Sequence, residues 1–530
     1  MQRGKKQSFV QGIITLMFSQ VFIKILGLIY KLYLTNKEGF GDSGNAIYSS
    51  GFQIYALLLT ISSVGVPNAV SKLVSERSSI GDERGAKRIF KIAFVVFSTI
   101  GFTSSAFLFM NANFIAVNIL QIPETELTLQ ALAPSIFFVS IISVFRGYFN
   151  AKENMRPTAN SQAIEQFTKT IFTVGIVEYI CAYINVKNKT ALMAAGASIA
   201  TTIATLISYF YLFDYYRKDK YTRTTNNTRK QDRIVTIIKN IAIVSAPITI
   251  SAILGTINKN IDSVTIVRGL KNFMTMEEAK IQYGILSGKV ETLITLPMSF
   301  NIALTTSLVP TIAAAKARKC LKDVENKINF SLLVTILIGL PSSAGMIVFA
   351  KEILNLLFPN ASSGAFIYQI SAMSITFILL NQTITGILQG LGKQFTPVIS
   401  LLAGVAVKLI INLSLVPVNP ENFILGGTAG AAFGTVMCYA VSMIINFIAL
   451  HKNVNLKLDK VKFLVKPVIC TILMTVGSSL IFYILKGIIQ EKLATIVSII
   501  CAAIIYVLSV ILIKLFNKGE ISLRKKLKTS

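Results

Sequence analysis

Four lysines lie within stretches of sequence that are apolar enough to cross a membrane: Lys24, Lys169, Lys289 and Lys408. A charge near the centre of a bilayer costs at least about 2.5–3.5 kcal/mol on insertion scales. Such a lysine is retained where it faces a partner, the protein interior or a water-filled cavity. Several cations in one helix bundle therefore indicate a cavity that binds an anion. A neutral ligand would not require this charge, and a cationic drug would be repelled by it.

The polar residues of these stretches follow helical stripes. Gln20, Lys24 and Lys31 share one face of the first predicted helix, although Lys31 could also extend to the interface. A second stripe combines Gln162, Glu165, Gln166 and Lys169. Glu165 and Lys169 have the spacing of an ion pair within one helix. Lys169 therefore has two interpretations, a structural ion pair or a ligand of the substrate.

Three later apolar stretches also carry polar groups, namely Asn258, Lys259 and Asp262, then Lys289 and Glu291, then Lys408 and Asn412. No acidic residue lies near Lys408 in the sequence, so a local ion pair does not explain it. The predicted anion ligands are Lys24, Lys31, Lys169, Lys259, Lys289 and Lys408. The predicted supporting polar residues are Gln20, Gln162, Glu165, Gln166 and Glu291.

The sequence contains no recognisable catalytic set. Its only histidine, His451, ends an apolar stretch, and its five cysteines form no CxxC pair. Glycine patterns such as GYFNAKENMRP lack the strand that a phosphate-binding loop requires. We therefore predict a transporter rather than an enzyme, with no cofactor and no metal. Without an ATPase module, the energy must come from an ion gradient, the membrane potential or the substrate gradient.

Composition indicates that the helices that position these lysines cross a membrane. The 530 residues are 53% hydrophobic and 14% charged, with a mean hydropathy of +0.64. A soluble protein would carry about 25% charged residues. The net charge of +28 is typical of basic cytoplasmic loops rather than of nucleic-acid binding. We expect a multi-pass membrane protein with both termini in the cytoplasm.

Fourteen apolar stretches of about 20 residues or more, each long enough to cross a bilayer, predict an all-α protein with fourteen transmembrane helices. The expected spans are 9–34, 47–75, 88–111, 127–149, 157–183, 190–213, 237–267, 281–313, 326–350, 365–391, 395–416, 427–451, 461–486 and 491–516. We expect an N-lobe of six helices (1–213), a basic cytoplasmic linker (214–236), a C-lobe of six helices (237–451), and two further helices with a basic tail (452–530).

An internal repeat supports two lobes around a central cavity. FRGYFNAKENMRPTANSQ (145–162) aligns with ITGILQGLGKQFTPVISL (384–401), so that Gly147 pairs with Gly386. Lys169 pairs with Lys408 at the same offset. Because six helices separate the copies, both have the same orientation, and we expect parallel lobes related by an axis along the membrane normal.

Four segments carry a resemblance to a known family: KILGLIYKLYL (24–34), IYALLLTISSVGVPNAVSKLVSE (54–76), FRGYFNAKENMRPTANSQAIEQ (145–166) and SLVPTIAAA (307–315). The chain resembles the MOP exporter superfamily, which includes the multidrug (MATE) transporters. Within it, the chain is similar to the MurJ-type lipid II flippases and the stage V sporulation protein B group of polysaccharide export proteins. The resemblance covers essentially the whole chain.

The resemblance implies transport of an undecaprenyl-diphosphate-linked saccharide by alternating access, with lipid II as the expected substrate. Basic residues of helices 1 and 8 would engage the diphosphate, which here are Lys24, Lys31 and Lys289. Here helix 1 carries lysines where family members often have arginine, and it lacks the acid that often follows them. The implied partners are the lipid-linked anionic glycan, membrane lipids and, as a driving force, Na⁺, H⁺ or the membrane potential. Some family members bind sodium between helices 7, 11 and 12, where Asn258, Asp262 and Asn412 have suitable chemistry.

Three alternatives remain open from the sequence. The first is a flippase for another lipid-linked unit of the capsule, envelope or spore cortex. The second is a cation-coupled multidrug exporter, a mechanism that favours a carboxylate in helix 1, where this chain has only Lys24 and Lys31. The third is a membrane protein that scaffolds an envelope or sporulation complex, which would not need buried lysines in both lobes.

Overall fold

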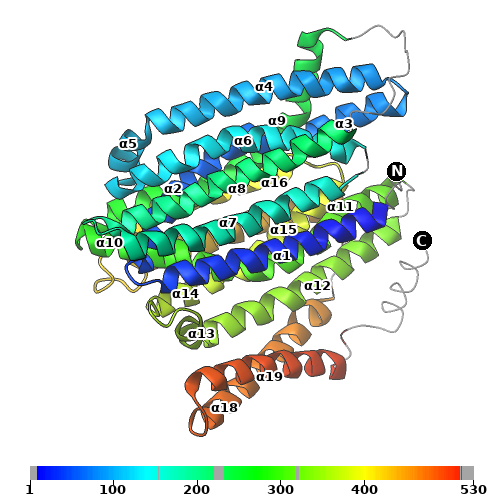
Figure 1. Ribbon diagram of the computed structural model, residues 1–530. Coiled ribbons are helices and arrows are strands. Elements are labelled where there is room, and N and C mark those ends of the chain that lie inside the picture. Colours follow the sequence, from blue (N-terminus) through cyan, green and yellow to red (C-terminus); the bar gives the residue numbers. More distant parts are fainter. Residues whose placement is uncertain are drawn as a thin grey trace. The chain divides into compact units, whose positions relative to one another are not determined.

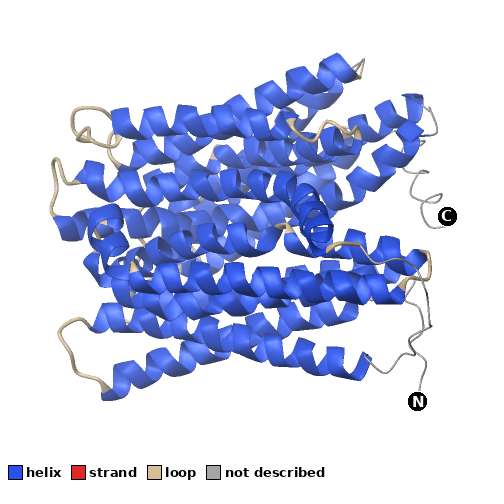
Figure 2. Ribbon diagram, turned by 90° about the horizontal axis from the view of Figure 1, so that it is seen from above, coloured by secondary structure: helices blue, strands red, loops and turns tan. Residues whose placement is uncertain are grey.

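The structure is a computed structural model that describes residues 9–152, 154–219, 232–317, 321–454, 456, 459–513 and 515. Every regular element among these residues is a helix, and no strand occurs in this part of the chain (Figure 2). The all-helical prediction is therefore confirmed. The helices divide between two compact units, unit 1 with residues 1–292 and 409–431, and unit 2 with residues 293–408 and 432–530.

Unit 1 contains most of the helices from the first half of the chain. They are α1 (Phe9–Asn36), α2 (Gly41–Leu59), η1 (Thr60–Val64), α3 (Val66–Ser79), α4 (Glu83–Met110), α5 (Ala112–Phe114), η2 (Ile115–Leu120), η3 (Pro123–Thr125), α6 (Glu126–Ala151), α7 (Arg156–Tyr183), α8 (Lys189–Asp219), α9 (Ile234–Leu270), α10 (Met276–Gly284) and η4 (Ile285–Val290). η1, η2 and η4 are π-helical turns, and η3 is a 3₁₀ turn. The end of α16 and the start of α17 also belong to this unit.

Unit 2 contains α12 (Leu321–Val348), α13 (Ala350–Leu357), α14 (Ala365–Ala372), α15 (Ser374–Gly390), the π-helical turn η5 (Val461–Val465), α18 (Lys466–Lys486) and α19 (Glu491–Leu512). It also contains most of α11 (Glu291–Ala317), α16 (Thr396–Leu415) and α17 (Thr428–Asn453). Within this unit α18 packs against α19 and α12, and α13 packs against α14 and α19 (Figure 1).

Local sequence signals explain where several helices begin. The side chain of Asp82 accepts a hydrogen bond of 2.8 Å from the backbone N–H of Gly85 and so caps α4. Thr275 and Glu278 form a reciprocal capping box at the start of α10. Pro157 occupies the first turn of α7, where a proline costs no helical hydrogen bond.

Eleven helical segments among the described residues are long and apolar enough to cross a membrane. They are Gly41–Ser79, Glu83–Met110, Pro123–Ala151, Lys189–Lys218, Ile234–Leu270, Lys322–Val348, Ala365–Gly390, Thr396–Leu415, Thr428–Asn453, Val461–Lys486 and Glu491–Leu512. The other three expected spans fall on α1, α7 and α11, and their crossing of the membrane stays a prediction. α8 extends to Asp219 and α9 begins at Ile234, so most of the expected linker lies outside the described residues.

An aromatic core fixes the helices of unit 1. Phe90 of α4 packs against Phe145 and Tyr148 of α6, with ring centroids 5.5 Å and 4.9 Å away. It also stacks on Tyr216 of α8 at 4.8 Å. Figure 1 shows α4, α6, α8, α7 and α1 running side by side in that order, and each packs against the next. This packing places α1 and α7, which carry the two predicted polar stripes, next to each other.

Candidate functional site

The predicted polar stripes of α1 and α7 lie at one helix–helix contact in unit 1. Gly27 of α1 faces Gln166 of α7 there, and a Cβ atom at residue 27 would lie 3.6 Å from the Nε2 atom of that glutamine, an ordinary van der Waals distance. Gln162 and Gln166 are half-buried on α7. Gln20 belongs to α1, but its side chain lies outside the described residues. Lys31 of the α1 stripe and Lys169 of the α7 stripe approach the same neighbouring side chain.

That neighbour is Tyr48 of α2. The Nζ atom of Lys31 lies 5.1 Å from the centroid of its ring, and the Nζ atom of Lys169 lies 5.9 Å from it. Both lysines are buried, with 6% and 8% of their surface exposed. Lys31 also donates a hydrogen bond of 3.4 Å to the hydroxyl oxygen of Ser49. Within the described part of the chain, neither ammonium group forms an ion pair with a carboxylate.

Glu165 does not supply the carboxylate that Lys169 lacks. It forms an ion pair with Arg146 of α6, whose Nη2 atom lies 2.9 Å from its Oε2 atom. Arg146 also donates from Nε to the hydroxyl oxygen of Ser161 at 3.0 Å. The ion pair that the spacing of α7 allowed is therefore made between two helices, and Lys169 is held by aromatic rings instead.

Lys289 is fully buried on η4 and forms an ion pair with Asp42 at the first turn of α2. Its Nζ atom lies 2.8 Å from the Oδ2 atom of Asp42, and the aspartate side chain is only 9% exposed. Glycines permit this close approach. A Cβ atom at Gly284 would overlap the carbonyl oxygen of Asp42, and one at Gly288 would lie 2.5 Å from the Cγ atom of Asn45. We call this contact of α2 with α10 and η4 the seam.

Further polar contacts join the seam at α10. Ser43 donates a hydrogen bond of 2.9 Å to Glu277, and Lys280 forms ion pairs with Glu124 at 2.7 Å and with Glu277 at 2.6 Å. Burial raises the pKa of Glu277, but the hydrogen bonds from Lys280 and Ser43 outweigh it and the pKa lies below its ordinary value. Burial lowers the pKa of Lys280, but the two glutamates outweigh it and the pKa is raised.

The remaining predicted lysines have different surroundings. Lys24 is exposed on α1. Lys259 of α9 forms an ion pair with Glu291, and 45% of its side chain is exposed. Lys408 of α16 is buried in unit 2, with 1% of its surface exposed. The structure therefore brings Lys31 and Lys169 to one ring and gives carboxylate partners to Lys259 and Lys289.

Of the three residues that were predicted to bind a cation, Asp262 and Asn412 are in contact. The Nδ2 atom of Asn412 donates hydrogen bonds of 2.9 Å to Asp262 and to the hydroxyl of Thr265. Asn412 is fully buried, and its Oδ1 atom has no hydrogen-bond partner. Asn258 is buried one turn before Asp262 on α9. These oxygen atoms fit a hard cation. No group of three His, Cys, Asp or Glu side chains suited to a metal occurs in the described ranges.

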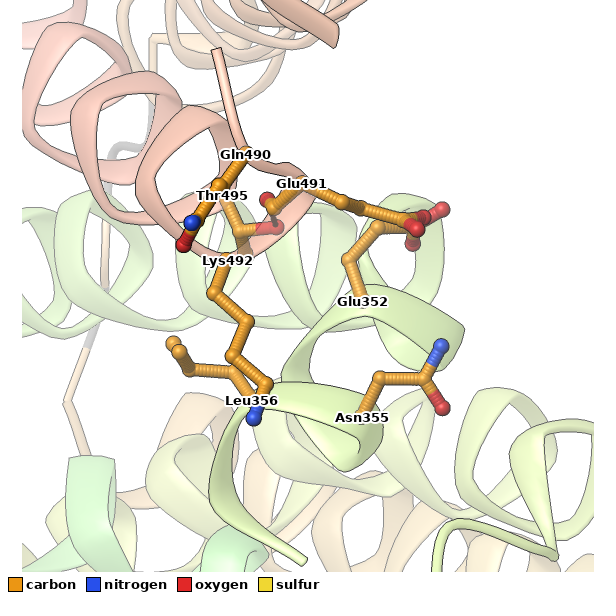
Figure 3. Close-up of a pocket in the computed structure, with 7 residues that line it drawn as sticks. All are labelled: Glu352, Asn355, Leu356, Gln490, Glu491, Lys492 and Thr495. Atoms are coloured by element: carbon orange, nitrogen blue, oxygen red, sulfur yellow. Dashed lines mark hydrogen bonds between the residues drawn. The ribbon is translucent and has the colours of Figure 1, made fainter. Parts of the chain in front are cut away.

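A separate cavity of about 320 Å³ lies in unit 2 between α13 and α19. Its lining residues are Glu352, Asn355, Leu356, Gln490, Glu491, Lys492 and Thr495 (Figure 3). It contains none of the predicted site residues.

Sequence reasoning missed the residues that surround the lysines. Asp42 was missed because helix 2 was predicted to begin at residue 47, whereas α2 begins at Gly41. Tyr48 was missed although Tyr48, Phe52 and Tyr55 follow the i, i+4, i+7 spacing of one helical face. That aromatic stripe was a readable signal, since rings are common partners of buried cations.

Residues 9–316 match the model of a family described as "Polysaccharide biosynthesis protein". The chain belongs to this family. Residues 283–413 also match the MatE family. Curated relatives in Bacillus subtilis include the stage V sporulation protein B, 28% identical with 82% of each chain covered, and the lipid II flippase MurJ, 25% identical with 89% of this chain and 86% of the relative covered. The uncharacterized membrane protein YabM is 29% identical, with 88% and 84% covered.

Solved structures show the same fold. The lipid II flippase MurJ in an inward closed conformation aligns with a TM-score of 0.71 at 15% identity, covering 94% of this chain and 99% of that one. An inward-facing MATE family transporter aligns with a TM-score of 0.66 at 13% identity, covering 84% and 98%. The predicted membership of the MOP superfamily is confirmed, and the protein is a multi-pass membrane protein.

Proposed function

We propose that this protein is a flippase that moves an undecaprenyl-diphosphate-linked saccharide across the bacterial plasma membrane. The proposed substrate is the peptidoglycan precursor lipid II. The observation that carries the proposal is the burial of four lysines in the helices of a polysaccharide biosynthesis family member. Lys31, Lys169, Lys289 and Lys408 are 6%, 8%, 0% and 1% exposed. Buried cations at membrane depth mark the path of a substrate, and their sign favours an anionic group such as a diphosphate. The relatives named as flippases support the same class of substrate.

A second substrate of the same class is the lipid-linked unit of another envelope polysaccharide or of the spore cortex. The relative named stage V sporulation protein B supports this alternative. Both substrates share a prenyl diphosphate, so the lysines serve either one. A multidrug exporter is less well supported, because α1 contains lysines and no carboxylate.

We propose that fourteen spans form two parallel six-helix lobes around a central cavity, with α18 and α19 as an additional pair. Two glycine contacts support the repeat. A Cβ atom at Gly147 would lie 2.8 Å from Val70 and 2.9 Å from the carbonyl of Pro67, on α3. A Cβ atom at Gly386 would lie 3.6 Å from Thr305, on α11. Gly147 of α6, in the fourth expected span, thus faces α3 of the second span. Gly386 of α15, in the tenth expected span, faces α11 of the eighth span, so the two contacts are equivalent in the repeat.

In the proposed cycle, the buried lysines attract the diphosphate into a cytoplasm-facing cavity, and partial neutralisation of their charge allows the lobes to rock outward. Asp262, Thr265 and Asn412 would hold the coupling cation if the cycle is driven by sodium. Both chain termini are proposed to lie in the cytoplasm, where the basic loops are favoured.

Lipid II transport by the purified protein in proteoliposomes tests this function. We expect saturable flipping that is reduced in Lys24→Ala and Lys289→Ala and unchanged in the exposed control Lys187→Ala. Efflux of a cationic dye without transport of any prenyl diphosphate would contradict the proposal and assign the chain to the multidrug branch. Unchanged flipping in both lysine variants would leave the substrate correct but remove these residues from the site.

A further inference from the structure

The cavity between α13 and α19 in unit 2 has no part in the proposed transport site. Its volume of about 320 Å³ lies at the lower end of the range for small-molecule sites, about 300–1,000 Å³. Glu352 and Asn355 line it from α13, and Thr495 lines it from α19 (Figure 3). Gln490 and Lys492 line it from the turn that joins α18 to α19 and from the start of α19. The cavity therefore suits a small ligand that contacts both elements.

Glu352 brings to the cavity a carboxylate that forms no ion pair among the described residues. Its Oε2 atom is buried and accepts no hydrogen bond from this part of the chain. Glu491 also lines the cavity, but its carboxylate is paired with Lys486 at a distance of 3.1 Å. A buried acceptor without a donor is unfavourable, and a charged donor satisfies a carboxylate best. Glu352 therefore favours a ligand that carries an ammonium group.

Lys492 brings the opposite charge to the same cavity. It forms no ion pair with Glu352 or with any other carboxylate in the described ranges. Figure 3 shows the Lys492 side chain extending toward Leu356 and the Glu352 side chain extending away from it. The amide groups of Asn355 and Gln490 line the same space and can both donate and accept hydrogen bonds. Two opposite charges that do not pair, together with two amides, match a ligand with an ammonium group, a carboxylate and a peptide group.

We propose that this cavity binds a zwitterion of about dipeptide size, with its ammonium group at Glu352 and its carboxylate at Lys492. In the proposed topology, the turn that joins α18 to α19 lies on the side opposite to the termini, so the ligand arrives from outside the cell. A free peptide and a peptide carried by the lipid-linked substrate offer the same chemistry. The site does not depend on the identity of the transported lipid, and its test needs no transport.

The test measures the affinity of the purified full chain for alanyl-alanine in detergent micelles, from the rise in Tm as the peptide is added. N-acetyl-alanyl-alanine lacks the ammonium group, and alanyl-alanine amide lacks the carboxylate. We expect the wild-type protein to bind each blocked peptide on the order of tenfold more weakly, because one charge-assisted contact is lost.

Two variants assign each contact to its residue. Glu352→Gln should bind alanyl-alanine and its N-acetyl form with similar affinity, while it still discriminates against the amide. Lys492→Met should show the reverse pattern. The control Lys351→Met, which changes an exposed neighbour of Glu352 on α13, should keep the wild-type pattern. Because each comparison is a ratio of affinities within one variant, a lower starting Tm does not affect it.

No rise in Tm with alanyl-alanine, or equal affinity of the wild-type protein for all three peptides, would overturn the proposal. Flipping in proteoliposomes separates the two sources of the peptide. Reduced flipping in Glu352→Gln and Lys492→Met would assign the peptide to the lipid-linked substrate, and unchanged flipping would assign the site to a free peptide. If the protein shows this peptide selectivity but flips no prenyl diphosphate, the proposed function is wrong and the zwitterion site stands.

Discussion

At the scale of single residues, the seam depends on a charge pair that is almost completely removed from water. The side chains of Lys289 and Asp42 are 0% and 9% exposed, and their charged atoms lie 2.8 Å apart. Removing two charges from water is costly, and their attraction offsets that cost only while both partners are present. A single substitution here is therefore expected to be more harmful than a double one.

We predict that Asp42→Asn lowers stability by about 3–5 kcal/mol, because it leaves the buried Lys289 facing a neutral amide. Thermal unfolding in detergent micelles would measure this as a lower Tm. The double variant Asp42→Asn with Lys289→Met should recover most of the loss, since no charge is then left at the contact. Equal melting temperatures for Asp42→Asn and the wild-type protein would show that the pair does not hold the seam.

The sequence predicted the burial of several site lysines but not the residues that they contact. The burial of Lys169, Lys289 and Lys408 followed from their apolar flanking residues. On helix α1 the same reasoning favoured Lys24, which is exposed, over Lys31, which is buried. Their partners did not follow, because Asp42 and Tyr48 are brought to them by helices that are distant in sequence. Local spacing even indicated the wrong partner for Glu165, which contacts Arg146 of another helix.

At the scale of elements, the all-helical fold was predictable because the backbone N–H and C=O groups of a membrane-spanning segment must form their hydrogen bonds within the protein. Helix positions agreed with the apolar periodicity, while their ends depended on caps such as Asp82. The π-helical turn of η4, which contains Lys289, carried no readable sequence signal. Such turns insert a residue into the helical ladder and often occur at functional sites.

The seam itself is made possible by two glycines one helical turn apart, Gly284 and Gly288. We predict that Gly284→Ala forces α10 away from α2, because the new methyl group would overlap the carbonyl oxygen of Asp42. The expected loss is about 1–3 kcal/mol, measured as a lower Tm in micelles. Gly255→Ala on α9 is the matched control, since a Cβ atom there meets nothing within 4 Å and alanine favours a helix. Similar melting temperatures for both variants would contradict the close approach.

The polar contacts of α10 give the seam a pH dependence. The pKa of Glu277 lies below its ordinary value, so its contribution is present above the unfolded pKa of about 4.3 and is lost as the pH falls through the folded pKa. The raised pKa of Lys280 means that its contribution is lost only at strongly alkaline pH. We predict that Glu277→Gln lowers Tm near pH 7 and that this difference shrinks as the pH falls below about 4.3 and through the lower folded pKa. Parallel Tm curves over this range would disprove the ionic contribution of Glu277.

At the scale of the whole molecule, unit 2 ends in a helix pair with little burial of its own. Within α19 only Ala494, Thr495, Ser498 and Ser509 are buried, and Leu480 and Ile484 of α18 are more than half exposed. The pair packs against α12 through a small cluster that includes Leu333 and Cys470. Wide apolar faces of this kind suit contact with lipid, and a lipid-linked substrate needs such a surface for its tail.

We predict that a chain ending at Asn453, which lacks α18 and α19, binds undecaprenyl diphosphate at least about tenfold more weakly than the full chain. The reason is that each methylene group removed from water contributes about 0.8 kcal/mol, so a long tail loses much of its affinity without an apolar surface. Farnesyl diphosphate has the same headgroup with a short tail, and its affinity should be unchanged, which also checks that the shortened chain is folded. Equal loss of both ligands would indicate general unfolding, and equal retention of both would exclude α18 and α19 as the surface that holds the tail.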